Sequence, residues 1–223
     1  MIIIYPTSLS ATLDATAESL FHQKSIPPNL QDEIATMMLH RQCQSGVNSG
    51  FFIPFAAESE AKVMLYTGEQ LNTTLARTHI LLIEAVRILK LLALESHALT
   101  QSIHLADQRM EKMCYSNFCA KGECKALTIA YLRYLLLDCT GNSTLKIKTH
   151  LTNLTDQRDG KGKWGGFPFY YTILALSESD EPLVIQELQY ALPTCQKQQA
   201  QNWPADPISI RRQEIIAKAL VKR

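Results

Sequence analysis

Apolar residues recur at helical spacing along most of the chain. Pro27 and Pro28 precede the segment 29–39, in which early acidic residues are followed by one apolar stripe, a pattern typical of a helix start. The segment 72–96 differs because it is apolar on nearly all sides. Such a segment predicts a helix in the centre of the fold, with neighbours packed on several faces.

The same periodicity predicts further helices toward the C-terminus, and no segment has the pattern of a β hairpin or a βαβ unit. Short connections between consecutive helices favour antiparallel neighbours. We therefore predict an all-α fold of stacked antiparallel helical hairpins, arranged as a solenoid or an incomplete α/α toroid. The additional predicted helices span 99–115, 123–138, 145–157, 169–177, 181–199 and 208–221.

The segment 44–57 interrupts this helical pattern. It combines turn-forming residues with an apolar loop that contains Phe51, Phe52 and Phe55. These aromatic side chains could line a pocket, or they could simply pack the loop against the core. The sequence predicts a single helical domain over 1–223, with its most plausible break at 44–57.

Composition excludes several classes of protein. Of 223 residues, 46% are hydrophobic and 19% are charged, which supplies a core and excludes a disordered chain. The formal net charge of +1 gives no basic excess for nucleic-acid binding. The N-terminus does not resemble a signal peptide and no segment is long and apolar enough for a membrane span. We expect a cytoplasmic protein with reduced thiols.

Three cysteines, Cys114, Cys119 and Cys124, are spaced five residues apart. On one continuous helix their side chains would point in different directions. Asn117 and Gly122 are expected to break the helix between them, which would allow the sulfurs to converge. The triad is therefore a candidate zinc site.

A tetrahedral zinc ion would need a fourth ligand, and the candidates are Cys43, His40 and Cys139. Two other interpretations of the triad stay open. The cysteines could be ordinary packing residues, which is common for this residue type. They could also form a redox-sensitive pair, if Lys121 and Lys125 lower the pKa of Cys119 or Cys124. No cofactor is expected other than zinc.

A glycine-rich loop provides one family resemblance. Gln157 is followed by Gly162 and Trp164, and an aromatic helix runs from Phe169 to Leu176. This pattern, over Gln157 to Leu176, resembles the QW-type repeat of the terpene cyclase and protein prenyltransferase superfamily. The resemblance implies a junction between two helices of an α/α toroid. On physical grounds, the glycines would permit a tight turn and the tryptophan would cover the junction.

The chemistry of that superfamily is not matched elsewhere in the sequence. Its protonating cyclases use an Asp-x-Asp-Asp cluster, which this chain does not contain. Its zinc-dependent transferases use an Asp-x-Cys pair, whereas Asp138 and Cys139 are adjacent. The resemblance therefore favours the fold more than the activity.

Three hypotheses for function follow. The leading hypothesis is a helical scaffold, not catalytic, that binds a protein segment or an apolar small molecule on a concave face. The first alternative is an isoprenoid-related enzyme with a helical cavity. The second is a zinc- or thiol-dependent switch that operates through Cys114, Cys119 and Cys124. The candidate ligand-binding residues of the scaffold are the aromatic residues Phe51, Phe52, Phe55, Trp164, Phe167, Tyr170 and Tyr171.

Overall fold

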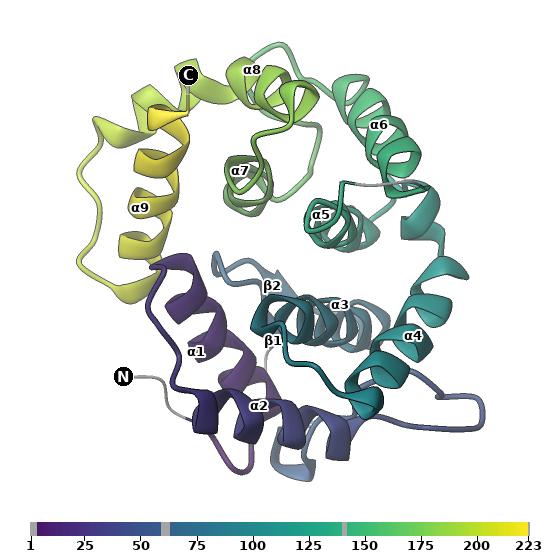
Figure 1. Ribbon diagram of the computed structural model, residues 1–223. Coiled ribbons are helices and arrows are strands. Elements are labelled where there is room, and N and C mark those ends of the chain that lie inside the picture. Colours follow the sequence, from purple (N-terminus) through teal and green to yellow (C-terminus); the bar gives the residue numbers. More distant parts are fainter. Residues whose placement is uncertain (1–3, 59–62, 140–141, 223) are drawn as a thin grey trace. The chain divides into compact units, whose positions relative to one another are not determined.

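The computed structural model describes residues 4–58, 63–139 and 142–222 (Figure 1). Within these residues there are nine α-helices, so the predicted all-α class is confirmed. The α-helices are α1 (Leu9–Phe21), α2 (Pro28–Arg41), α3 (Thr74–Leu92), α4 (His97–Glu111), α5 (Cys124–Leu135), α6 (Asn142–Thr155), α7 (Phe169–Ser177), α8 (Pro182–Gln199) and α9 (Pro207–Val221). The smaller elements are the 3-10 helices η1 (Ala56–Glu58) and η2 (Cys114–Asn117), and the strands β1 (Val63–Met64) and β2 (Gln70–Leu71).

Two elements differ from the sequence predictions. Helix α1 had no predicted counterpart, because several positions on its buried side are Thr or Ser. The expectation of no β hairpin was wrong, since β1 and β2 pair antiparallel, with Val63 opposite Leu71. These strands have two residues each, which is too short for an alternating pattern to be recognised in the sequence.

The chain divides into two compact units, each of which is described by itself. The first comprises Met1–Tyr66 and Gln70–Met113, and the second comprises Thr67–Glu69 and Cys114–Arg223. The segment 44–57 lies inside the first unit. The single domain over 1–223 and the solenoid or toroid arrangement stay predictions.

Helix α3 is the central element of the first unit. Its neighbours are α1, α2 and α4 (Figure 1). Side chains are buried on most sides of this helix, as the all-round apolar pattern of 72–96 predicted. The helix begins where Thr73 accepts a hydrogen bond from the backbone N–H of Ala76, and it ends at Ala93, whose φ is 51°.

A buried carboxylate joins η1 to the start of α1. Glu58 accepts hydrogen bonds from the hydroxyls of Ser8 and Ser10 and from the backbone N–H groups of Leu9, Ser10 and Phe55. Burial raises the pKa of Glu58, but these hydrogen bonds outweigh it and hold the pKa below its ordinary value. The negative charge also lies at the positive end of the helix dipole.

A second buried titratable group lies on α3. His79 is 4% exposed, and its ring meets Phe51 edge-on at 4.9 Å between centroids. The guanidinium of Arg109 stacks on Phe51 at 4.3 Å. Burial, together with the charge of Arg109, lowers the pKa of His79 to about 4. The native state therefore favours the neutral imidazole.

The second unit is built around α5 and α7. Helix α7 packs against α5, α8 and α9, and α5 also contacts α6 and η2 (Figure 1). Ten consecutive residues of α5, from Ala126 to Leu135, are buried. Helices that are buried on nearly all sides are expected where other helices surround them.

The loop 156–168 joins α6 to α7. It folds back on itself, because Gly165 N–H donates to the carbonyl of Gln157 at 2.8 Å. Trp164 is 2% exposed and covers this junction. The fold of the loop therefore depends on backbone hydrogen bonds and on one buried tryptophan.

Glu187 on α8 fixes this loop. Its carboxylate accepts hydrogen bonds from Trp164 Nε1 at 2.6 Å, from the hydroxyl of Thr155 at 2.6 Å and from the guanidinium of Arg158 at 2.8 Å. Glu187 is 2% exposed, so its charge is compensated by these donors instead of by water. The sequence pattern gave no indication of this role.

No helix of the described residues is both long enough and apolar enough to cross a membrane.

We expect Glu187→Ala to destabilise the second unit by about 3 kcal/mol, because it leaves the buried indole N–H of Trp164 without its acceptor and removes the ion pair with Arg158. Urea unfolding followed by tryptophan fluorescence measures this change. The matched control is Gln186→Ala, an exposed position on the same helix, which should stay within about 0.5 kcal/mol of wild type. Equal effects of the two substitutions would contradict the anchoring role.

His79 should contribute an acid-sensitive component to stability. Its pKa falls from 6.5 in the unfolded chain to about 4 in the native state, so the unfolded chain binds the proton first. Stability is complete above pH 6.5 and is lost as the pH falls toward 4, by at most about 3 kcal/mol. His79→Gln should flatten this part of the profile of unfolding free energy against pH. His104→Gln is the control, since that imidazole is exposed; a profile unchanged by His79→Gln would refute the assignment.

Candidate functional site

The three cysteines of the candidate metal site lie around the connection between η2 and α5. Cys114 is the first residue of η2, Cys124 is the first residue of α5, and Cys119 lies in the loop between them. Their sulfur atoms all lie within 4.8 Å of one another. The predicted convergence of the triad is therefore present in the structure.

Backbone conformation produces this convergence. Phe118 and Gly122 have φ values of 68° and 48°, so the chain turns sharply on both sides of Cys119. The left-handed region is unfavourable for a phenylalanine and persists only where surrounding contacts enforce it. The ring of Phe118 packs against those of His150 and Phe167, at 5.8 and 5.7 Å between centroids.

Thr128 fixes the position of Cys119. The buried hydroxyl of Thr128 accepts from the N–H of Cys119 at 3.1 Å and donates to its carbonyl at 2.9 Å. Thr128 lies one helical turn after Cys124, so α5 supplies both a sulfur and the clamp for the neighbouring one. Sequence reasoning missed Thr128, because a threonine within a helix has no distinguishing pattern.

The sulfur geometry fits metal coordination. Cys114 and Cys124 have their sulfur atoms 3.8 Å apart. Two thiolates on one tetrahedral zinc ion, with Zn–S bonds of about 2.3 Å, are separated by about 3.8 Å. Cys114 is exposed, whereas Cys119 and Cys124 are partly buried. The triad could therefore bind a metal ion at an edge that solvent reaches.

The pKa of Cys124 differs from the one that the redox-sensitive interpretation of the triad requires. Burial, reinforced by the neighbouring thiols of Cys114 and Cys119, raises its pKa to about 12. Lys125 was expected to lower the pKa of Cys119 or Cys124. Its ammonium instead donates to the carbonyl of Gly165 at 2.7 Å and lies over the ring of Phe167. For Cys124 the expected lowering was wrong, and without a bound cation this thiol stays protonated near neutral pH.

Of the three predicted fourth ligands, one belongs to the same unit as the triad and two belong to the first unit. Cys139 is in the second unit but is not a member of the convergent group. Its sulfur lies 3.7 Å from the carbonyl of Leu136. His40 and Cys43 belong to the first unit, so their contribution stays a prediction. Within the described part of the second unit, no histidine or acidic side chain joins the three cysteines as a potential metal ligand.

The three phenylalanines of the 44–57 loop have different surroundings. Phe52 is fully buried in the core of the first unit. Phe51 is partly buried between Arg109 and His79. Phe55 is partly exposed, and the guanidinium of Arg41 lies 4.4 Å above its ring. Of the three, Phe55 is the one that lines a described pocket.

The aromatic candidates of the second unit mostly pack inside it. Trp164, Phe167 and Tyr171 are buried. Tyr170 is partly exposed, and its hydroxyl donates to Gln198 at 3.2 Å. These contacts account for the four residues as parts of the packed fold, and their role in ligand binding stays a prediction.

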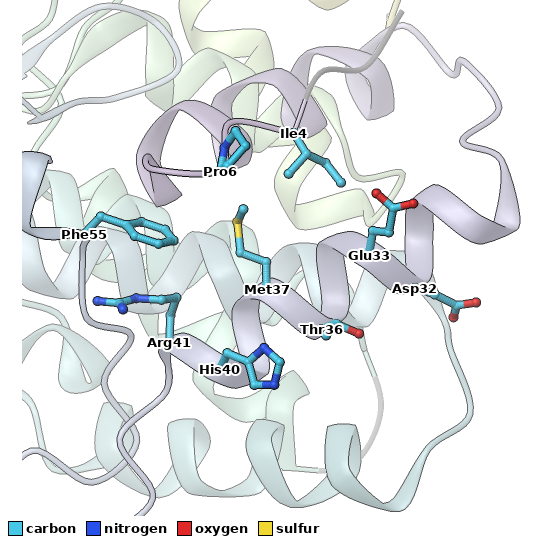
Figure 2. Close-up of a pocket in the computed structure, with 9 residues that line it drawn as sticks. All are labelled: Ile4, Pro6, Asp32, Glu33, Thr36, Met37, His40, Arg41 and Phe55. Atoms are coloured by element: carbon cyan, nitrogen blue, oxygen red, sulfur yellow. The ribbon is translucent and has the colours of Figure 1, made fainter.

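The pocket next to Phe55 is lined mainly by α2 (Figure 2). Its volume is about 570 Å³, which falls in the range of small-molecule sites. Figure 2 shows Met37 rising into the middle, Phe55 and Arg41 at one end, and the carboxylate of Glu33 at the other. The full lining is Ile4, Pro6, Asp32, Glu33, Thr36, Met37, His40, Arg41 and Phe55.

The guanidinium of Arg41, at one end of this pocket, already contacts groups of the protein. It donates to the carbonyls of Ile53 and Pro54 at 2.8 and 2.7 Å and lies over Phe55. Arg41 therefore holds the loop that carries Phe55 against α2. Apart from Phe55, sequence reasoning missed the lining, since these residues come from three separate segments with no common motif.

Scans of family models, curated proteins and solved structures find no match for this chain.

Proposed function

We propose that the protein binds one zinc ion through Cys114, Cys119 and Cys124, and that the ion acts as a switch on local structure. The observation that carries this proposal is the convergence of three sulfurs within 4.8 Å, with one pair at the separation expected for ligands of one tetrahedral ion. Thiolates are soft ligands that suit zinc, so the chemistry of the donor set supports the same ion.

Metal binding at the triad would require ionisation of Cys124, and the start of α5 offsets part of that cost. Cys124 is the first residue of α5, and the N-terminus of a helix stabilises nearby negative charge. A bound cation would displace the proton of Cys124, whose pKa is otherwise raised to about 12 by burial and the neighbouring thiols. Binding is therefore coupled to proton release.

Metal binding would also be coupled to local folding. The ion would connect η2 to the start of α5 across a loop that contains the unfavourable φ of Phe118. Since the unfolded chain lacks a preformed site, the free energy of binding would add to the stability of this turn. Loss of the ion would release the connection between η2 and α5.

The test is native mass spectrometry of the protein after incubation with zinc, in a phosphine reductant. We expect one zinc per chain in wild type and none in Cys119→Ser, which removes the central ligand. Cys139→Ser is the matched control, because that cysteine is in the same unit but outside the triad, and it should retain one zinc. Chelation should lower the melting temperature of wild type but leave that of Cys119→Ser unchanged. Equal zinc binding by wild type and Cys119→Ser would refute the proposal.

A second candidate function is the binding of an apolar small molecule in the pocket on α2. It is supported by the pocket volume of about 570 Å³ and by Phe55, which the sequence had suggested as a ligand residue. Met37 in the middle of the pocket and Phe55 at one end supply apolar surface (Figure 2). This candidate corresponds to the predicted ligand-binding scaffold, while the isoprenoid-related enzyme stays a prediction.

The pocket candidate is tested with Met37→Trp, in which a larger side chain would fill the centre of the pocket. We expect wild type to bind an environment-sensitive apolar dye with a saturable rise in fluorescence, and the variant to bind it at least about tenfold more weakly. The control is Gln189→Ala, an exposed position of the second unit, which should bind the dye as wild type does. Equal dye binding by all three proteins would exclude the pocket as the site.

A further inference from the structure

The further inference rests on the proposed zinc site and concerns how many ligands the triad supplies to the ion. Zinc in structural sites has four protein ligands, whereas sites with three protein ligands keep a position for an exchangeable ligand. In the described part of the second unit, the triad supplies three thiols as potential ligands. A metal ion held there would have its fourth position available.

Access to that position is provided by Cys114. This cysteine is exposed, whereas Cys119 is held by Thr128 and Cys124 starts a largely buried helix. The three sulfurs therefore form a site with a fixed inner side and an outer edge at Cys114. A ligand from solution can approach the ion at that edge.

We infer that the fourth ligand of an ion held by the triad is a thiolate from outside the chain. Thiolates are soft ligands that suit zinc, so we expect a fourth thiolate to be favoured over a carboxylate at this ion. The incoming thiol loses its proton to the buffer, its sulfur bonds to the ion, and a bound water leaves. No electron is transferred. The thiolate can come from a small thiol or from a cysteine of another protein chain.

The experiment uses cobalt(II) as the probe, under anaerobic conditions and with a phosphine reductant. Sulfur-to-cobalt charge-transfer absorption grows with the number of thiolates on the ion. Adding glutathione to the one-to-one cobalt protein should raise this absorption by about one third, from three thiolates to four, and the rise should saturate. Cys139→Ser, the matched control, should respond as wild type does.

A second arm distinguishes the source of the thiolate. Without glutathione, the cobalt protein is concentrated and its absorption per chain is followed. A rise with concentration identifies a cysteine of a second copy as the fourth ligand, whereas a constant value leaves the small thiol as the source. Either result, together with a fourth sulfur at saturation, supports an external thiolate at the fourth position of the ion.

Two results would overturn the inference without refuting the proposed zinc site. The first is an absorption that glutathione does not change; His40→Ala and Cys43→Ser then identify a fourth ligand from this chain. The second is loss of cobalt to glutathione with no increase beforehand. By contrast, failure of wild type to give any sulfur-to-cobalt absorption would refute the zinc site itself, and the inference would fall with it.

Discussion

The geometry of the α-helix is the constraint on which the cysteine triad depends. Side chains five residues apart on one helix are separated by about 140° around its axis, so Cys114, Cys119 and Cys124 cannot converge on a continuous helix. The sulfurs converge because the helical structure is interrupted between η2 and α5. The chain turns there, with Phe118 and Gly122 at positive φ. Aromatic contacts of Phe118 hold this conformation, and the packing of the second unit therefore positions the sulfurs.

Each unit also contains a buried carboxylate that orders a junction. Glu58 satisfies N–H groups at the start of α1, and Glu187 satisfies side-chain donors of the loop between α6 and α7. Helix ends and short loops leave polar groups without partners, and burial makes such groups costly unless an acceptor is supplied. A single carboxylate with several donors meets this requirement. The loop that carries Trp164 is thereby fixed by the same helix, α8, against which α7 packs.

Most helices could be predicted from periodicity, and the failures have physical reasons. The bounds of α7 agree with the prediction, and those of α8 and α9 differ by one residue at the start. Helix α1 was missed because Thr12, Thr16 and Ser19 occupy its buried side. Their hydroxyls donate to backbone carbonyls four residues earlier, which makes burial tolerable while concealing the apolar stripe.

The sequence by itself determined the helical class, the burial of α3 on most sides and the cysteine spacing that makes a metal site conceivable. These are properties of local periodicity and residue type. Only the tertiary structure decided that the three sulfurs meet, that Phe52, Trp164 and Tyr171 are buried in the core, and that Met37 and Phe55 line a common pocket. Such placements depend on contacts between segments distant in the chain, and no local pattern encodes the packing that brings those segments together.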